Sequence, residues 1–358
     1  MNTRTIRFLG GLGAALIFSV SLAGCRLLGN AEGSSTMTGG TSDGGSAASS
    51  GEENGTTASA APVDVTYGAE DTSAAYDAAS ATAIVFNGGA MSIQGAGASA
   101  KGSVLTISAA GTYILSGTLT AGQVVVDAGK EDTVRLILNG VSITCANSAP
   151  LYAKKAAKTI LTLADGTQNT LTDGASYTFP DAETDEPSAA VFSKNDLTIN
   201  GGGTLTVTGR YNNGIASKDV LTITGGAIQV TAAGDGLRGK DGVAIQNGAF
   251  TIDAGTDGIK STNDTDAGKG WISLDGGTYS ITAANDGVQA ETVLQIAAGI
   301  YTLKTGGGSA NSSTDSKGDA RPGWGQWSAG GSGTTADTPS AKGLKAGAGI
   351  LLTGGVFT

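Results

Sequence analysis

The sequence predicts an all-β fold, a right-handed single-stranded parallel β-helix with about 22 residues per coil. An Asn-Gly or Asp-Gly turn before an apolar residue recurs, with its glycine at Gly214, Gly236, Gly258 and Gly287. Two of these steps are 22 residues long, and the third is 29 because it contains the polar insertion NDTDAGK. Each turn is followed by two short segments in which apolar and polar residues alternate. This constant period favours a solenoid over an antiparallel sandwich.

The alternation also predicts the core. Equivalent strands of successive coils lie side by side, so their inward-facing residues should form columns. Less regular strands begin near Ile84, and the segment EDTSAAYDAAS before them is expected to form a short helix or cap over the open end. The expected columns are Leu221, Val243, Ile272, Leu294; Ile223, Ile245, Leu274, Ile296; Ile228, Phe250, Tyr279, Tyr301; and Val230, Ile252, Ile281, Leu303.

The N-terminus has the pattern of a secretory signal. Basic residues precede the apolar run FLGGLGAALIFSVSLAG, which ends at Cys25. Residues 1–24 resemble a bacterial lipoprotein signal, which implies cleavage before Cys25 and a lipid on its sulfur. Residues 25–62 are rich in Ser, Gly and Thr and are expected to be a disordered tether. We therefore expect the protein on the extracellular face of the bacterial cell envelope, touching the membrane through its lipid only.

Composition excludes several classes of function. The net charge of −10 disfavours nucleic acid as a partner, because phosphate binding needs a basic surface. The chain has no histidine, which excludes Ser-His-Asp and Cys-His nucleophiles, His-ligated haem and His-containing zinc sites. We identify no catalytic residue, and any metal should be a hard, oxygen-seeking ion. Once Cys25 is lipidated, Cys145 has no partner, and its apolar context predicts a buried, inert thiol.

A family resemblance supports the fold. The segments AAVFSKNDLTINGGGTLTVTG and NGIASKDVLTITGGAIQVTAAGDGLRGKDGVAIQNG resemble a bacterial extracellular carbohydrate-binding β-helix family, similar to pectate-lyase-type solenoids. The likeness runs from about Thr82 to Thr358. It implies a right-handed parallel β-helix, bound calcium, and affinity for cellulose-like or acidic glycans without a need for catalysis.

The resemblance also divides the chain. We expect the carbohydrate-binding β-helix with its N-terminal cap in residues 63–305, a Gly/Ser-rich loop in 306–340, and the start of a further coil in 341–358. The family pattern continues beyond such a coil, so we expect a C-terminal truncation. An uncapped solenoid end is the alternative.

The acidic turns have two interpretations. Asp235, Asp257 and Asp286 should align on successive coils, where their carboxylates could hold Ca²⁺. The insertion adds Asp264 and Asp266 as further candidate ligands. In the alternative interpretation Asp caps its own turn, Gly supplies a positive φ, and nearby cations neutralise the charge. Those cations are Lys218, Arg238, Lys240 and Lys260, which could instead bind uronate carboxylates.

Aromatic side chains suggest where a sugar could stack. Trp324 and Trp327 are separated by two residues in the polar loop, and Trp271 opens a strand after the insertion. Burial against the solenoid is the alternative for all three, and we favour it for Trp271.

Three functions remain open at this stage. The favoured one is a surface-anchored, non-catalytic polysaccharide-binding protein, monomeric and assisted by calcium. The second is a calcium-dependent polysaccharide lyase, in which a cation acidifies the proton beside a uronate carboxyl and Arg238 or a lysine removes it. The third is a structural surface adhesin, which requires only the rod and the anchor.

Overall fold

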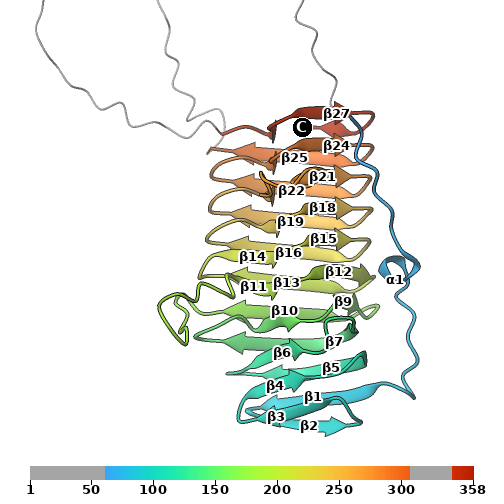
Figure 1. Cartoon of the computed structure of the whole chain (residues 1–358), viewed down its shortest axis with the longest axis vertical. Coiled ribbons are helices and arrows are strands. Elements are labelled where there is room, and N and C mark those ends of the chain that lie inside the picture. The colour runs from blue at the N-terminus through green and yellow to red at the C-terminus, as the bar shows by residue number, and fades with distance from the viewer. Residues whose placement is uncertain (1–60, 307–340) are drawn as a thin grey trace, which may run out of the picture. The chain divides into compact units, whose positions relative to one another are not determined.

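The computed structural model describes residues 61–306 and 341–358, and they form a parallel β-helix, as the sequence predicts (Figure 1). The lipoprotein signal, Cys25, most of the tether, Trp324 and Trp327 lie outside these residues. No helix in the described part of the chain is long and apolar enough to cross a membrane.

The solenoid has three faces, each built from one strand per coil. The first face contains β9 (Lys158–Leu163), β12 (Asp196–Gly201), β15 (Val220–Ile223), β18 (Gly242–Ile245), β21 (Trp271–Leu274), β24 (Val293–Ile296) and β27 (Gly349–Leu352). The second contains β10 (Gln168–Asp173), β13 (Thr204–Gly209), β16 (Ala227–Ala232), β19 (Ala249–Ala254), β22 (Thr278–Ala283), β25 (Ile300–Thr305) and β28 (Val356–Phe357). The third contains β4 (Val104–Ile107), β6 (Gln123–Asp127), β8 (Leu151–Lys155), β11 (Ala189–Ser193), β14 (Asn213–Ser217), β17 (Leu237–Gly239), β20 (Ile259–Ser261), β23 (Val288–Ala290) and β26 (Leu344–Ala346).

The first coils differ from the later ones. The long strands β5 (Gly111–Leu119) and β7 (Thr133–Cys145) bend across the corner, so that β7 pairs with β9 through its first half and with β10 through its second. The first and second faces consequently form one sheet. At the N-terminal end, β2 (Ala90–Gln94) pairs antiparallel with β1 (Thr82–Gly88), and β3 (Ala98–Lys101) pairs antiparallel with β4. These reversals terminate both sheets.

The predicted core columns are confirmed. Leu221 pairs with Val243, which pairs with Ile272, and all three side chains are fully buried. In the second face the rings of Phe250, Tyr279 and Tyr301 stack at centroid distances of 4.8 and 4.6 Å. Each such aromatic pair adds about 0.5–1.5 kcal/mol beyond its burial. Because each coil covers half of its neighbour's apolar surface, the columns hold the rod together.

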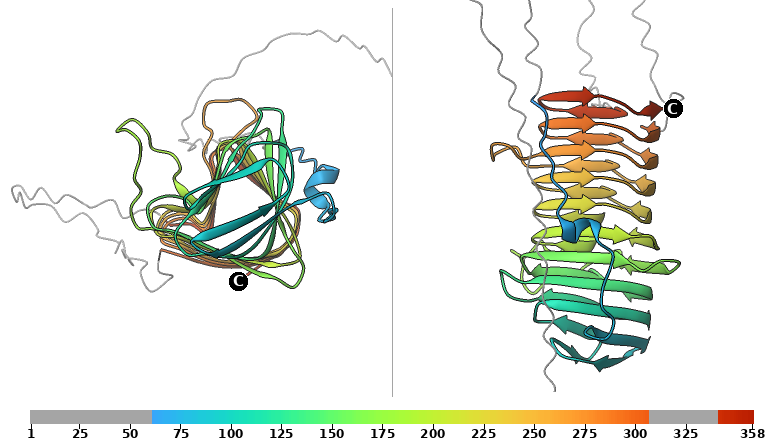
Figure 2. Two further views of the ribbon diagram at one scale, coloured as in Figure 1. Left: turned by 90° about the horizontal axis from the view of Figure 1, so that it is seen from below. Right: turned by 90° about the vertical axis from the view of Figure 1, so that its right-hand side faces the viewer.

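The segment before the first coil was expected to cover the open end, and that expectation is wrong. Residues 61–81, which we call the strap, run along the outside of the first face, antiparallel to the direction of coil growth (Figure 2). Its only helix is α1 (Ala69–Thr72), which lies against β12. The strap has mostly small side chains and no alternation of large apolar residues that could enter the core, and it bonds to the polar outer side chains of the first face.

Side chains of the strap and of the first face fasten the strap at several places, among them Val63, Tyr67 and Asp71. The backbone N–H of Val63 donates to Gln295 Oε1 at 3.1 Å, and the Tyr67 hydroxyl donates to Asp275 at 2.8 Å. The Asp71 carboxylate accepts from the Thr198 hydroxyl at 2.7 Å and from the Lys158 ammonium at 3.0 Å. Burial would raise the pKa of Asp71, but the bonds from Thr198 and Lys158 outweigh it and hold that pKa below its ordinary value.

The glycines of the acidic turns serve a different purpose from the one expected. None of them has a positive φ. A Cβ on Gly236 would instead lie 2.4 Å from Ile252 Cγ2 and 2.6 Å from the carbonyl oxygen of Gly258. Glycine is required because the neighbouring coil approaches too closely for a side chain. Positive φ is found at another corner, for example 142° at Gly248.

Candidate functional site

The acidic turns form a ladder of side-chain hydrogen bonds, which we call the acidic ladder (Asn213, Asp235, Asp257 and Asp286). One side-chain oxygen of each member accepts the backbone N–H of the next coil: Asn213 from Asp235 at 2.9 Å, Asp235 from Asp257 at 3.2 Å and Asp257 from Asp286 at 2.9 Å. Asp286 accepts in turn from the N–H of Lys342 at 2.8 Å. All four side chains are buried. The ladder ties adjacent coils together at this corner.

The second oxygen of each aspartate is paired with a cation, which lies three residues later in the chain for Asp235 and Asp257 and on the next coil for Asp286. Asp235 meets Arg238 at 3.4 Å. Asp257 meets Lys260 at 2.5 Å. Asp286 meets Lys345 at 3.0 Å. Buried carboxylates are tolerated when they are paired and hydrogen-bonded, and both conditions are met here.

This arrangement bears on calcium. A dication beside the acidic ladder would lie next to Arg238, Lys260 and Lys345, whose charges oppose it, so these residues as arranged do not fit Ca²⁺. The residues that the structure describes contain no group of three or more acidic or cysteine side chains placed to hold a metal ion. Calcium binding stays a prediction.

The other two candidate ligands lie elsewhere in the coil. Asp264 and Asp266 follow β20, whereas Asp257 precedes it, and both are exposed. Asp266 accepts from Asn263 Nδ2 at 3.0 Å and pairs with Lys269 at 3.4 Å. The bonds from Asn263 and Lys269 hold the pKa of Asp266 below its ordinary value. The structure therefore does not bring the insertion and the acidic ladder together.

The outer surface of the third face changes from aromatic to cationic along the rod. Tyr152 and Phe192 lie in register on β8 and β11, with ring centroids 5.8 Å apart. Ala216 follows on β14, and then Arg238 on β17 and Lys260 on β20. Arg238 and Lys260, two of the cations identified in the sequence, thus lie in one row with the apolar residues Tyr152, Phe192 and Ala216. The sequence period alone did not identify this apolar patch.

A second row of cations begins where the strands of the third face end. Each member follows a residue that is paired in register with its neighbour: Lys154 lies in the last part of β8, and Lys194, Lys218 and Lys240 come directly after β11, β14 and β17. All four lysines are exposed. We call them the lysine row. Equivalent positions on neighbouring coils lie roughly 4.8 Å apart. The row is therefore a line of closely spaced positive charges on an acidic protein.

A loop rises beside these rows. Residues 174–188 connect β10 to β11, and the Tyr177 ring stacks on Tyr211 at 4.1 Å. The Tyr177 hydroxyl donates to Asp173 at 2.7 Å. Burial raises the pKa of Asp173, although hydrogen bonds from the Arg210 N–H and the Tyr177 hydroxyl act in the opposite direction. This cluster fixes the first half of the loop.

Glu186 fixes the second half. Its carboxylate pairs with Lys194 at 2.8 Å and with Lys218. Burial acts against the charge of Glu186, but the hydrogen bonds from Lys194 and Lys218 prevail and hold its pKa below the ordinary value. The side chain is only 15% exposed. Two members of the lysine row are thus neutralised from within the chain.

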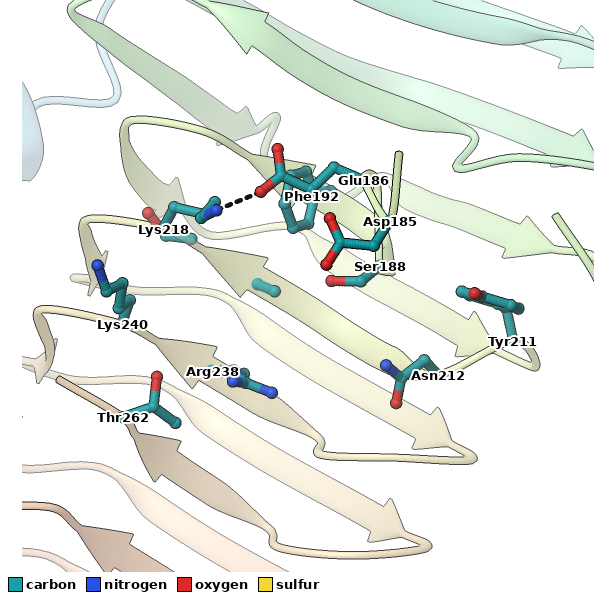
Figure 3. Close-up of a pocket in the computed structure, with 12 residues that line it drawn as sticks. Asp185, Glu186, Ser188, Phe192, Tyr211, Asn212, Lys218, Arg238, Lys240 and Thr262 are labelled. Atoms are coloured by element: carbon teal, nitrogen blue, oxygen red, sulfur yellow. Dashed lines mark hydrogen bonds and ion pairs between the residues drawn. The ribbon is translucent and has the colours of Figure 1, made fainter. Parts of the chain in front are cut away.

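The loop and the third face enclose a groove of about 540 Å³ (Figure 3). Phe192, Ala216 and Arg238 lie on the third face, and Asp185 and Glu186 belong to the loop. The lining also includes Lys218, Lys240 and Tyr211. Within residues 61–306 and 341–358, Lys240 has no carboxylate within ion-pair distance. An ammonium without an ion pair, in a groove that is also lined by Phe192 and Tyr211, could bind an acidic sugar.

Comparison with known proteins agrees with this chemistry. Residues 101–358 match the model of a family described as carbohydrate-binding domain-containing proteins. The chain belongs to this family. A carbohydrate-binding domain-containing protein of Acetivibrio thermocellus is 48% identical over 122 residues, 34% of this chain and 43% of that relative, so the match spans less than half of the relative's length.

A solved structure is also similar. The polysaccharide lyase-like protein from C. thermocellum, determined as a gadolinium derivative, superposes with a TM-score of 0.66 at 33% identity. The superposition covers 77% of this chain and 99% of that one. The parallel β-helix is therefore shared with a polysaccharide lyase-like protein.

Trp271 lies on a different side of this carbohydrate-binding domain. It opens β21 on the first face and is half-buried, with its indole against Gly242. It separates two hollows beside the strap, of about 210 and 460 Å³. The structure does not bring Trp271 together with Arg238 or Lys240. Lys260 forms an ion pair with Asp257 of the acidic ladder.

Several residues of the groove were not predicted from the sequence. Phe192, Tyr211 and Glu186 were not identified as candidates, although they come from segments that depart from the period of 22 residues. The signal was the length of the stretch between β10 and β11, since an insertion in a solenoid coil maps to a loop on one face. Its polar and aromatic composition could then have suggested a binding site.

Proposed function

We propose that this protein is a surface-anchored, non-catalytic polysaccharide-binding protein, and that the groove beside residues 174–188 receives an acidic glycan. The observation that carries the proposal is Lys240, a cation without a carboxylate partner in the described residues, in a groove that also presents Arg238 and the Tyr211 ring. Membership of the carbohydrate-binding family supports it.

Sugar chemistry matches this lining. A pyranose ring has apolar faces that pack on an aromatic ring, while its hydroxyls and any carboxylate lie at the rim. An ammonium that has no internal partner can form a charge-assisted hydrogen bond to a uronate carboxylate. Because the protein as a whole carries a net charge of −10, an acidic glycan should be repelled elsewhere and confined to this groove.

The location is part of the proposal. The apolar run ending at Cys25 supports lipid anchoring, and the Ser/Gly/Thr-rich residues 25–62 would hold the β-helix away from the membrane. The protein would then act at the extracellular face of the bacterial cell envelope.

Binding to polygalacturonate, with matched variants, tests the proposal. Lys240→Gln should weaken binding about two- to fivefold, the range of one ordinary surface ion pair, and the loss should shrink as salt is added. Lys101→Gln removes the same charge from an exposed position on β3 and should bind like the wild type. Equal binding by both variants would show that the groove is not the binding site. A glycan array without any signal would favour a structural adhesin instead.

Cellulose-like glycans call for a different test, because Trp324 and Trp327 lie outside the residues that the structure describes. We propose that Trp324 and Trp327 form a stacking platform, on the ground that two indoles occur in a short, otherwise polar stretch. Replacing both by Ala should lower retention on insoluble cellulose. Unchanged retention would leave the platform without support.

A polysaccharide lyase is the second candidate, favoured by the likeness to the polysaccharide lyase-like protein and by the position of Arg238 in the groove. β-Elimination needs a base and a positive charge at the uronate carboxyl. The ultraviolet absorbance of an unsaturated product from polygalacturonate distinguishes the two: its appearance establishes the lyase, and binding without it favours the non-catalytic protein.

A further inference from the structure

Glu186 lies at the edge of the groove and bridges two coils. One carboxylate oxygen pairs with Lys194, which follows β11, and the other with Lys218, which follows β14. The distance to Lys194 is 2.8 Å, and Glu186 is 15% exposed while the two lysines are 42% and 47% exposed. A carboxylate of the chain itself therefore already bridges two adjacent members of the lysine row.

The members of the lysine row differ in whether they have an ion pair. Lys154 is paired with Asp127 at 2.7 Å. Lys194 and Lys218 share Glu186, and only Lys240 has no such partner among the described residues. The first three members of the lysine row are thus paired with carboxylates of the chain itself. The fourth, Lys240, is on the next coil and is not paired in this way among the described residues.

We infer that Glu186 is an internal competitor of the glycan: its carboxylate occupies the position on Lys194 and Lys218 that a glycan carboxylate would take. A glycan can therefore pair with these two lysines only by displacing Glu186. The inference rests on the proposed function, that the groove binds an acidic glycan. A single uronate needs only Lys240, with Arg238 beside it. A chain of uronates presents several carboxylates in succession and can compete with Glu186 along the row.

The loop can release this contact without losing its position. Its first half is held by the stack of Tyr177 on Tyr211 and by the hydrogen bond from Tyr177 to Asp173, neither of which involves Glu186. Neutralising Glu186 should therefore free two lysines and leave the groove in place. This expectation has an unusual direction: removing a native ion pair improves binding.

The test compares Glu186→Gln with Glu183→Gln in the full chain. Glu183 is an exposed residue of the same loop with no ion pair to the lysine row, so its substitution makes the same change of charge. Binding of a galacturonate hexamer and of the monomer is measured by calorimetry at two salt concentrations. Melting temperature and circular dichroism confirm that each variant is folded.

Glu186→Gln should bind the hexamer about three- to tenfold more tightly than the wild type, as expected from freeing two lysines of ordinary surface ion-pair strength. Its salt dependence should steepen, because more cations meet the polyanion. Affinity for the monomer should change little, and Glu183→Gln should match the wild type.

The remaining outcomes decide against the inference in separable ways. Equal hexamer binding by both variants, or weaker binding by a folded Glu186→Gln protein, overturns the competitor role while leaving the proposed function intact. An equal gain in both variants means that only the net charge of the loop matters, which also overturns it. If the wild type and both variants fail to bind the hexamer at all, the proposed function itself fails.

Discussion

Asp257 links two coils with one carboxylate: its Oδ1 accepts the backbone N–H of Asp286 at 2.9 Å, while its Oδ2 pairs with Lys260 at 2.5 Å. The same double contact recurs at Asp235 and Asp286. The repeat of an acidic turn thus has a structural cause, since each carboxylate accepts an N–H of the next coil and is neutralised by a nearby cation. The recurrence holds the register of the rod at this corner.

Substitutions at Asp257 should separate its two contacts. Asp257→Asn keeps an acceptor for the Asp286 N–H, as Asn213 does on an earlier coil, and should cost about 1 kcal/mol. Asp257→Ala leaves that N–H and Lys260 without their partner and should cost about 2–4 kcal/mol. Denaturant unfolding measures both, and equal costs would show that the hydrogen bond to the next coil contributes nothing.

Because adjacent coils approach each other closely at Gly236, adding a single methyl group there should destabilise the protein. In Gly236→Ala the new Cβ would meet Ile252 at 2.4 Å, so the variant should lose about 1–3 kcal/mol of stability through overpacking. Gly89 has no atom within 4 Å of such a Cβ and no positive φ, and Gly89→Ala should be neutral or slightly stabilising. Similar melting temperatures for the two variants would contradict the spacing described here.

The strap should be released at the extremes of pH. The pKa of Asp71 is lowered from 3.8, so its contribution is complete above that value and is lost as the pH falls through the lower, folded-state pKa. The pKa of Lys158 is raised from 10.5, so its contribution is complete below that value and is lost as the pH rises through the higher, folded-state pKa. Hydrogen exchange of residues 61–81 should show opening as the pH falls below 3.8 and through the lower, folded-state pKa of Asp71, before the core columns open.

Asp71→Asn provides the control for that measurement. Its strap should already exchange faster around residue 71 at neutral pH and should show little further change in acid, while the bonds of Val63 and Tyr67 remain. If exchange in the strap of the wild type rises only together with exchange in the core, the strap is not fastened independently through Asp71.

Calcium has an equally direct test. The acidic ladder is neutralised by Arg238, Lys260 and Lys345, so we expect added Ca²⁺ to shift the melting temperature by less than about 2 °C, a change below roughly 1 kcal/mol. A larger rise that EDTA reverses would establish calcium binding. Loss of that rise in Asp257→Asn would place the ion at the ladder, and its persistence would place it elsewhere.

Much of the site escaped prediction for a physical reason. Arg238 and Lys240 were identified because they fall at matching positions of the repeat. Glu186 was not, because its contact with Lys218 joins residues 32 apart, a separation unrelated to the period. The strap was misplaced for the same reason, since Asp71 meets Thr198 across 127 positions.

By itself, the sequence determined the β-helix and its core. A period near 22 with apolar residues at every second position leaves one way to bury Val243, Ile245, Phe250 and Ile252, namely against the same positions of the next coil. Only the tertiary structure decided where the strap lies, why Gly236 must be glycine and which lysines are already paired. Burial leaves a local, repeated trace in the chain, whereas contacts between a loop or strap and a distant coil occur once and leave none.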